Sequence, residues 1–214
     1  MFNKYFLVKS YIKHFFLAKN EHSLHSPFMF EFYNECIKKK IPKEQFILIE
    51  NLRKQLLKNT SEITITDFGA GSKIYKSNRR RISDIAKTSL SPKNQGELLY
   101  KIVSFLKPKT IIELGTSLGI TTSYLASGYK EANVFTLEGC PSIANEAQSV
   151  FNTLHFQKNT IIIGNIDDTF PKLIDNLESV DFVFFDGNHT EKATLHYFET
   201  ALKKINDKLI FSLD

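Results

Sequence analysis

Ile111-Ile-Glu-Leu-Gly-Thr-Ser-Leu-Gly-Ile-Thr-Thr-Ser-Tyr-Leu-Ala126 is the stretch that decides the fold, because it joins an apolar run, an acid, a glycine turn and a helix start. Gly115 and Gly119 let the backbone come close to a ligand, and the following helix offers N–H groups and a positive dipole end. A carboxylate or phosphate group is favoured there. The alternative is a plain tight turn between a strand and a helix.

Two other nucleotide-binding motifs do not fit this turn. A P-loop requires a lysine followed by serine or threonine, where this chain has Ile120-Thr121. A dinucleotide fingerprint requires Gly-x-Gly-x-x-Gly, whereas Gly115-Thr-Ser-Leu-Gly119 has a different spacing. Both kinds of site are therefore disfavoured.

From Leu98 onward, apolar strand-like runs alternate with helix-like segments. The alternation predicts an α/β protein with a parallel sheet, helices on both faces, and ligands at the carboxyl ends of the strands. The strands are expected at 110–114, 134–137, 160–163, 180–186 and 208–213, and the helices at 119–127, 141–151, 168–177 and 190–204.

The N-terminal part reads as helical. Apolar residues recur at roughly helical spacing over residues 2–18, with lysines between them. Such a helix could lie on a membrane, but packing against the main domain is favoured. Ser26-Pro27 predicts the start of a second helix, which covers residues 28–39.

A second glycine turn lies in Ile63-Thr-Ile-Thr-Asp-Phe-Gly-Ala-Gly-Ser72, which reads as an extended segment entering a turn. No amphipathic helix follows it directly. Residues 73–92 lack a sustained period and are expected to form a long loop with at most one helical turn. Arg79 to Arg81 in this loop belong to a lid over the site or to a solvated run.

An acid, Glu138, follows the apolar run Val134-Phe-Thr-Leu137, about twenty residues past the first glycine turn. In a doubly wound sheet, an acid at this place accepts hydrogen bonds from the ribose hydroxyls of an adenosine-containing cofactor. A glutamate at a strand end is common by itself. Its pairing with the glycine loop favours the ribose role.

Four motifs together resemble those of class I S-adenosylmethionine-dependent methyltransferases. They are Glu113-x-Gly-Thr-Ser-x-Gly119, Leu137-Glu-Gly139, Gly164-Asn-Ile-Asp167 and Phe185-Asp-Gly-Asn-His189. The last is similar to the Asp-Gly-x-His motif of the small-molecule O-methyltransferase-like branch. His22-Ser-Leu-His-Ser-Pro-Phe28 and Asp67-Phe-Gly-Ala-Gly-Ser72 resemble the N-terminal extension of a bacterial group within that branch.

The resemblance covers nearly the whole chain and implies a Rossmann-like doubly wound parallel sheet of strand order 3-2-1-4-5. Residues 1–95 would form an N-terminal helical extension with a lid-like loop, and residues 96–214 the S-adenosylmethionine-binding domain. In the family the sheet continues with a further helix and two more strands. We therefore expect the sequence given to lack the last strands.

The resemblance also implies S-adenosylmethionine as the cofactor, together with the residues that contact it. The residues for the amino-carboxypropyl arm, for the ribose and for the adenine occur in that order along the chain. The residues are Glu113, Gly115, Thr116, Ser117 and Gly119 for the arm, Glu138 and Gly139 for the ribose, Asn165 and Asp167 for the adenine, and Asp186 beside the methyl group.

Asp186, Asn188 and His189 come where the fourth strand ends, beside the place expected for the methyl group. Methyl transfer is an in-line displacement, so the protein must mainly align the acceptor and remove its proton. An imidazole exchanges protons near neutral pH, so His189 is the expected base and Asp186 its orienting partner. The alternative is that both residues only cap the helix that begins near Thr190.

Asp186 could also bind a divalent metal ion, which would need further oxygen ligands from the end of the fifth strand. Asp214 falls there, and it is the last residue of the sequence. No metal ligand is assigned, and metal dependence stays open.

Composition narrows the partners and the compartment. The net charge is +5, but the basic residues are spread out apart from Lys38 to Lys40 and Arg79 to Arg81, so nucleic acid is disfavoured. Two cysteines, Cys36 and Cys140, are too few for a disulfide framework and fit a reducing cytoplasm. Lysines interrupt the apolar N-terminus, so no signal peptide and no membrane span are expected.

The leading hypothesis is methyl transfer to a hydroxyl of a small molecule. Methylation of RNA or protein is the second hypothesis, motivated by the net charge and the arginine run. An inactive cofactor-binding or interaction module is the third. An apolar last strand would be an edge that another subunit could cover, so the chain could form a homo-oligomer.

Overall fold

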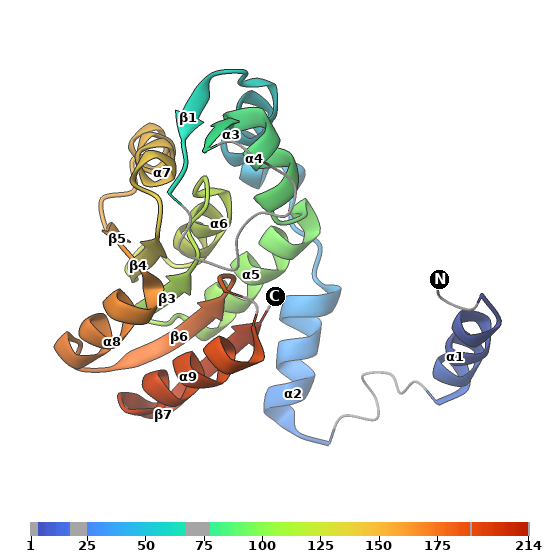
Figure 1. Cartoon of the computed structure of the whole chain (residues 1–214). Helices are drawn as coiled ribbons and strands as arrows, with labels where there is room; N and C mark the ends of the chain where they lie inside the picture. Colours follow the sequence, from blue (N-terminus) through green and yellow to red (C-terminus); the bar gives the residue numbers. More distant parts are fainter. Residues whose placement is uncertain (1–3, 18–24, 67–77, 189, 214) are drawn as a thin grey trace. The chain divides into compact units, whose positions relative to one another are not determined.

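The computed structural model describes residues 4–17, 25–66, 78–188 and 190–213, in two compact units, residues 1–40 and 41–214 (Figure 1). The first unit contains α1 (Lys4–Leu17), α2 (Pro27–Phe32) and a π-helical segment (Tyr33–Lys38). α2 begins as predicted: the Ser26 hydroxyl accepts the Met29 N–H at 3.4 Å, and Pro27 takes the first helical position.

The second unit opens with a 3₁₀ turn (Lys43–Phe46), α3 (Ile47–Lys58) and a two-stranded antiparallel sheet of β1 (Glu62–Thr64) and β2 (Arg79–Arg81). α4 (Ile82–Ser89) and α5 (Lys93–Leu106) follow. Strands and helices then alternate: β3 (Thr110–Leu114), α6 (Ile120–Gly128), β4 (Asn133–Glu138), α7 (Pro141–Thr153), β5 (Asn159–Ile163), α8 (Ile166–Asn176), β6 (Val180–Phe185), α9 (Glu191–Leu202) and β7 (Ile205–Leu213).

The parallel sheet confirms the predicted fold class. Its strands lie in the order β5-β4-β3-β6-β7, which is the order 3-2-1-4-5 of the resemblance. All pairings in it are parallel. β3 lies in the middle, and the direction of winding reverses between β3 and β6, which makes this the place where α/β sheets bind ligands.

Helices cover both faces of this sheet, because successive side chains of a strand point to opposite faces. Ile111 packs in a cluster with α5 and α6, whereas its neighbour Ile112 packs in a cluster with α8 and α9. The same alternation separates Phe184 from Phe185 in β6. Burial on both faces explains why these strands are almost continuously apolar.

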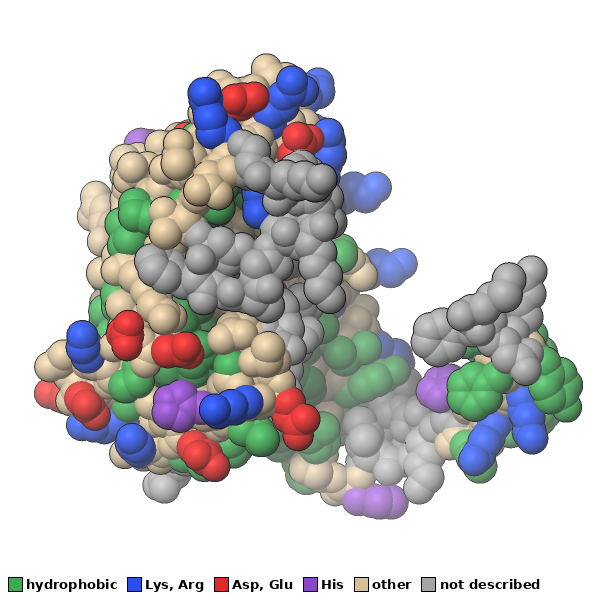
Figure 2. Space-filling model, in the orientation of Figure 1, with side chains coloured by type: hydrophobic (Ala, Val, Ile, Leu, Met, Phe, Trp, Pro, Cys, Tyr) green, Lys and Arg blue, Asp and Glu red, His purple; other side chains and the backbone are tan. Residues whose placement is uncertain are grey.

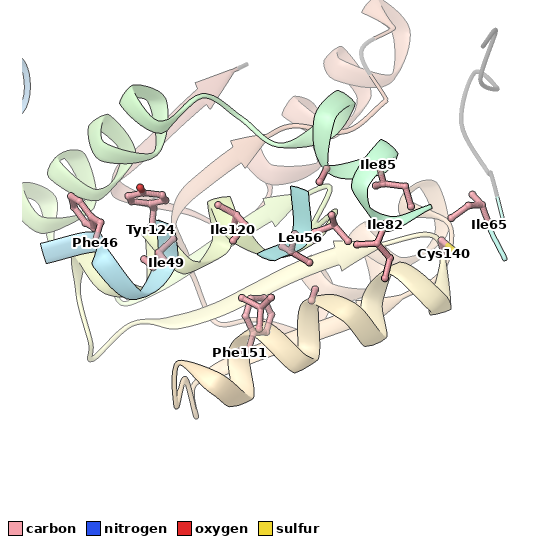
Figure 3. Packing of buried hydrophobic residues seen from close by; sticks show 14 residues of the cluster. Phe46, Ile49, Leu56, Ile65, Ile82, Ile85, Ile120, Tyr124, Cys140 and Phe151 are labelled. Carbon is pink, nitrogen blue, oxygen red and sulfur yellow. The ribbon is translucent and has the colours of Figure 1, made fainter. Parts of the chain in front are cut away.

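The expected loop over residues 73–92 is wrong for its described part, which forms β2 and α4. Ile82, Ile85 and Ala86 have helical spacing and are buried in a cluster with α3 and α7. Figure 3 shows Ile82 and Ile85 near Leu56 of α3. The apolar face is only two turns long and follows three arginines, so the periodicity was too short to recognise.

The boundary between the two compact units lies after residue 40 of the sequence, so α3 and α4 belong to the same unit as the parallel sheet. The boundary predicted at residue 95 divides the chain by role rather than by compactness, and it stays a prediction. Within the described ranges, every helix is too short or too polar to cross a bilayer.

Gly96 provides a test of the packing between α5 and α6. A Cβ on this buried glycine would lie 2.5 Å from Cδ2 of Tyr124. Glycine to alanine in a helix ordinarily stabilises by about 1 kcal/mol. Here we expect overcrowding to reverse the sign, so that Gly96→Ala lowers the free energy of unfolding by roughly 1–3 kcal/mol in urea denaturation.

Asn94→Ala is the matched control, because Asn94 is exposed in the same helix. Its free energy of unfolding should stay at or slightly above that of the wild type. A Gly96→Ala variant more stable than the wild type would show that the Tyr124 ring moves aside without cost.

Candidate functional site

Two cavities lie at the carboxyl ends of β3, β4 and β6, with volumes of about 270 Å³ and about 420 Å³. Gly115 and Glu138 line both, so the cavities border each other at these two residues. The first is further lined by Ile65, Thr66, Arg80, Leu137, Gly139, Cys140, Ile143, Asn165, Ile166, Asn188 and Tyr197, and the second by Thr88, Ser89, Leu90, Ser91, Pro92, Ser117 and Asp186.

The glycine turn after β3 has left-handed backbone at three places: Gly115 (φ 102°), Ser117 (φ 48°) and Gly119 (φ 78°). A Cβ on Gly115 would lie 2.4 Å from the carbonyl oxygen of Asp186. Only glycine fits there, because no rotation of a side chain could relieve a clash of Cβ with backbone. The turn therefore lies directly against the end of β6.

The N–H groups of this turn are largely used within the chain. Those of Gly115 and Thr116 both donate to the carbonyl of Leu137 at 3.0 Å, and that of Gly119 donates to the Thr116 carbonyl at 3.0 Å. The N–H of Ser117 donates to a carboxylate, as described below. The turn would thus serve a ligand mainly through its shape rather than through these four donors.

Glu113 is fully buried beneath the turn and is not among the described residues that line the cavities. Its Oε2 accepts hydrogen bonds from the hydroxyls of Thr122 and Thr136, the latter at 2.6 Å. Since Thr136 donates its one proton to Glu113, it accepts the proton of Thr116, at 2.6 Å. Oε1 is buried without a hydrogen-bond partner in the described part of the chain.

Burial raises the pKa of Glu113 to about 8. The two threonine hydroxyls oppose this rise, and the negative charges of Asp186 and Glu138 add to it. The carboxyl group is therefore mostly protonated at neutral pH. A neutral acid can be accommodated beneath the turn at far lower cost than a carboxylate.

Glu138 ends β4 and lies half-buried at the border of the two cavities. Its Oε2 accepts the N–H of Ser117 and its Oε1 accepts the N–H of Cys140, both at 2.9 Å. Burial raises the pKa of Glu138, while these backbone hydrogen bonds lower it. The N–H of Gly139 also contributes to this lowering, so about one of the roughly four acceptor positions of the carboxylate stays open toward a ligand.

The far end of the first cavity is formed by the loops after β5 and β6. Asn165 caps α8 by accepting the Asp167 N–H at 3.1 Å, and Asp167 accepts the hydroxyl of Tyr197 at 2.5 Å. Asn188 has left-handed backbone (φ 50°) and donates its side-chain amide to the Tyr197 oxygen at 3.4 Å. Burial and the hydrogen bond to Asp167 raise the pKa of Tyr197 to about 12.

Tyr197 was not predicted as a site residue. It lies in α9 and is 1% exposed, and its ring packs against Phe170 of α8. In the sequence such a residue reads as part of the apolar face of a helix. Only the crossing of α8 and α9 brings its hydroxyl to the cavity.

Asp186 lines the second cavity, and its N–H donates to the carbonyl of Leu114 at 2.9 Å. The cap of α9 is Thr190, whose hydroxyl accepts the Ala193 N–H at 3.4 Å. The alternative in which Asp186 caps this helix is therefore wrong. His189 lies outside the described residues, as does Asp214.

The outer wall of the second cavity, residues 88–92, was also missed by the sequence analysis. Hydrogen bonds hold it to the glycine turn and to α6. The hydroxyls of Ser89 and Ser117 are 2.7 Å apart, and those of Ser91 and Thr121 are 3.1 Å apart. The serines and the proline before α5 are typical of a turn, and they were the signal in the sequence that could have indicated this wall.

α3 holds the same wall from behind. The Arg53 guanidinium donates to the carbonyl of Ser91 at 2.7 Å and to Glu50 Oε1 at 2.9 Å. The Tyr124 hydroxyl donates to the same Glu50 oxygen at 2.7 Å. Because Glu50 and Arg53 are only 17% and 12% exposed, this pair is shielded from solvent and links α3, α6 and the wall.

Within the described residues, no three histidine, cysteine, aspartate or glutamate side chains gather in a way that could hold a metal ion. The sequence suggested Asp186 and Asp214 as residues that could bind a metal ion. Asp186 lies at the second cavity, and Asp214 is outside the described part.

The fold is Rossmann-like, the class of fold that commonly binds nucleotides. Its sheet is all-parallel and of this order, and the glycine turn, the acid and the two cavities lie where the direction of winding reverses. Residues 112–214 match the model of a family described as a methyltransferase domain. Relatives named O-methyltransferases are found among curated proteins. One is a catechol O-methyltransferase of Niastella koreensis, 30% identical over 118 residues, which are 54% of this chain and 52% of the relative.

Solved structures agree with this likeness. The O-methyltransferase TomG from Streptomyces achromogenes, in complex with SAM, is 25% identical with a TM-score of 0.55 over 59% of this chain and 57% of that one. An O-methyltransferase from Bacillus cereus, in complex with SAH, has a TM-score of 0.59 at 19% identity, over 86% and 70%. The sheet and its helices thus have the class I methyltransferase fold. The chain spans about half the length of the curated relatives that it matches.

The raised pKa of Glu113 makes stability depend on pH. The folded protein holds this proton up to about pH 8, whereas the unfolded chain loses it near the ordinary value of 4.5. The stabilisation is therefore complete below pH 4.5 and is lost as pH rises through about 8. Between these pH values the free energy of unfolding should fall as pH rises. The slope should correspond to a difference of at most one bound proton between the folded and the unfolded protein.

Glu113→Gln should abolish this part of the pH dependence, because the amide keeps an acceptor for the threonines but does not titrate. Urea denaturation of both proteins at several pH values between 5 and 8 measures the difference. Glu178→Gln, at an exposed position, is the control. Parallel curves for wild type and Glu113→Gln would show that Glu113 is ionised throughout.

Proposed function

We propose that this chain is an S-adenosylmethionine-dependent methyltransferase that acts on a hydroxyl group of a small molecule. The observation that carries the proposal is that two cavities border each other at Gly115 and Glu138, at the carboxyl ends of three parallel strands. A cofactor with a nucleoside end and an amino-acid end would extend from one cavity into the other. The relatives named O-methyltransferases support oxygen as the acceptor atom.

The first cavity suits the nucleoside end. The carboxylate of Glu138 would accept hydrogen bonds from the ribose at the positions that the backbone N–H groups of Ser117, Gly139 and Cys140 leave open. Ile143 and Ile166 offer apolar surface for a flat base. Gly139 would lie at the ribose beside Glu138, and Asn165 and Asp167 would lie near the adenine.

The second cavity suits the sulfonium and the amino-acid arm. Its described lining carries the carboxylates of Glu138 and Asp186 and no lysine or arginine. A positively charged sulfonium is favoured between such groups, whereas a phosphate is not. Gly115, Thr116, Ser117 and Gly119 would enclose the arm.

Glu113 would act from beneath, because it is buried below the turn and bonded to the hydroxyl network of Thr116, Thr122 and Thr136. Its Oε1 has no hydrogen-bond partner among the described residues, and it becomes an acceptor when Glu113 is ionised. In the proposal it binds the ammonium group of the arm or a water that contacts it. Binding of a cation would favour the ionised form of Glu113 and lower its pKa.

When bound, S-adenosylmethionine supplies an electrophilic methyl group, and the protein has to align an acceptor oxygen and remove its proton. Asp186 lies at the second cavity, where the methyl group would point. His189 follows three residues later and is proposed as the general base, with Asp186 as its orienting partner. A homo-oligomeric state and a cytoplasmic location stay predictions.

Isothermal titration of S-adenosylmethionine tests the ribose role of Glu138. Glu138→Ala removes charge-assisted hydrogen bonds to the ribose, which at this half-buried site together contribute about 1.5–3 kcal/mol. We expect the affinity to fall by roughly 10- to 100-fold. Glu178→Gln, on the exposed surface, should bind like the wild type.

Because Glu138→Ala also removes the hydrogen bond to Ser117, its melting temperature should be measured in parallel. A folded variant with wild-type affinity would exclude Glu138 from the ribose. Wild-type protein that binds no S-adenosylmethionine would contradict the proposed cofactor itself.

His189→Ala tests the proposed base. It should lower turnover by roughly 10²- to 10⁴-fold and leave the affinity for S-adenosylmethionine nearly unchanged. Asp186→Asn should change both, because Asp186 is proposed to contact the cofactor as well. Transfer of a labelled methyl group to a panel of phenols and catechols measures the rates. Wild-type turnover in His189→Ala, with only a lowered melting temperature, would assign His189 a structural role.

A further inference from the structure

The net charge of the chain is concentrated in its first unit. Residues 1–40 contain seven lysines and three glutamates, a net charge of +4 out of the +5 of the whole chain. Residues 41–214 contain twenty-one basic and twenty acidic residues and are nearly neutral. Within residues 1–20 there are four lysines and no acidic residue.

α1 combines this charge with exposed apolar side chains. All its described side chains are exposed, and the large apolar ones are 50–79% exposed. They are Tyr5, Phe6, Leu7, Val8, Tyr11, Ile12, Phe15, Phe16 and Leu17. In Figure 2 the side chains of α1, found by its place in Figure 1, are mostly hydrophobic with lysines beside them. Isolated apolar residues on a surface are ordinary, but a continuous set on one helix marks an interaction surface.

The apolar side chains are denser on one half of the helix surface, and Lys4, in the first turn, lies within that same half. At about 100° per residue, one half of the helix surface carries seven of the nine apolar side chains. These are Tyr5, Leu7, Val8, Tyr11, Ile12, Phe15 and Phe16. The opposite half carries Lys9, Ser10, Lys13 and His14, interrupted by Phe6 and Leu17.

We propose that α1 binds the surface of an anionic lipid bilayer, lying in the plane of the interface. The aromatic and aliphatic half would enter the boundary between headgroups and acyl chains, and Lys9 and Lys13 would face the negative headgroups. Tyrosine and phenylalanine suit this depth, since their rings are apolar and the tyrosine hydroxyl stays hydrated.

Charge complementarity favours a lipid surface over the two protein partners that α1 could meet. A second copy of α1 carries the same positive charge and no acid, so that two such helices repel each other. The remainder of the chain is nearly neutral and offers no excess of negative charge. A bilayer that contains anionic lipid supplies both the apolar layer and the negative charge.

The helix lies on such a surface rather than crossing it. Its 14 residues span about 21 Å, less than the roughly 30 Å of a bilayer core. Membrane attachment would place the proposed methyltransferase site near lipid-soluble acceptors, but the inference does not depend on that function. It rests on the charge and exposure of α1 alone.

Vesicle flotation with the full chain tests the proposal. The protein should float with vesicles of equal parts phosphatidylglycerol and phosphatidylcholine, and should stay in solution with phosphatidylcholine alone. Added salt should weaken the binding by screening. Absence of the protein from the anionic vesicles at low salt overturns the proposal.

Two variants separate the charged and the apolar contribution. Lys9→Gln with Lys13→Gln should weaken binding to the anionic vesicles by about 25-fold, which is about fivefold for each lysine. Phe15→Ser with Phe16→Ser should weaken it by roughly tenfold or more. Both should bind S-adenosylmethionine like the wild type.

The matched control is Lys54→Gln with Lys130→Gln, which removes the same charge from exposed positions of the second unit. This protein should float like the wild type. Equal weakening by the control and the α1 lysine variant would overturn the assignment to α1, because only net charge would then matter.

Fluorescence places the helix directly, because the chain contains no tryptophan. The emission of Phe16→Trp should shift to shorter wavelength when anionic vesicles are added, whereas that of Leu195→Trp, 55% exposed in α9, should not. A Phe16→Trp emission that is already blue-shifted without lipid would show that α1 packs on protein and overturn the proposal. The same holds if size-exclusion chromatography shows a dimer that the phenylalanine variant dissociates.

Discussion

The geometry of the candidate site depends on the close packing at Gly115, where no Cβ atom fits. The end of β3 lies so close to the end of β6 that a Cβ at this residue would touch the carbonyl of Asp186. Two further hydrogen bonds join the same turn to Leu137 of β4. One left-handed residue therefore couples three strand ends, and both cavities border it. A larger residue would push the turn away from β6 and change the two cavities together.

Residues with strained backbone lie beside the proposed ligand-binding groups at this edge of the sheet. Ser117 and Asn188 both have left-handed backbone, which costs of order 1–3 kcal/mol for residues other than glycine. The hydrogen bond from Ser117 to Glu138 offsets part of that cost. It also fixes the carboxylate before any ligand arrives, so a ligand would lose little free energy in ordering it.

The segments before the parallel sheet contribute to the site rather than only preceding it. α3 contacts the wall of the second cavity through Arg53, and Glu50 joins it to Tyr124 of α6. A shielded ion pair of this kind adds little net stability compared with apolar packing, but it defines one arrangement of its partners. The position of residues 88–92 is therefore coupled to a helix some forty positions earlier in the chain.

The sequence pattern by itself determined the parallel sheet and the edge where the candidate site lies, and the resemblance to a family gave the strand order. Strands buried on both faces are continuously apolar, and glycine turns and acids at strand ends are local patterns, so Gly115 and Glu138 could be identified without coordinates. Only the tertiary structure decided which groups meet there. The crossing of two helices brings Tyr197 to the cavity, and packing of α3 brings Arg53 to the carbonyl of Ser91 in the wall. Neither contact leaves a periodic or local trace in the sequence. The raised pKa of Glu113 is likewise a tertiary property, because it follows from complete burial rather than from the identity of its neighbours along the chain.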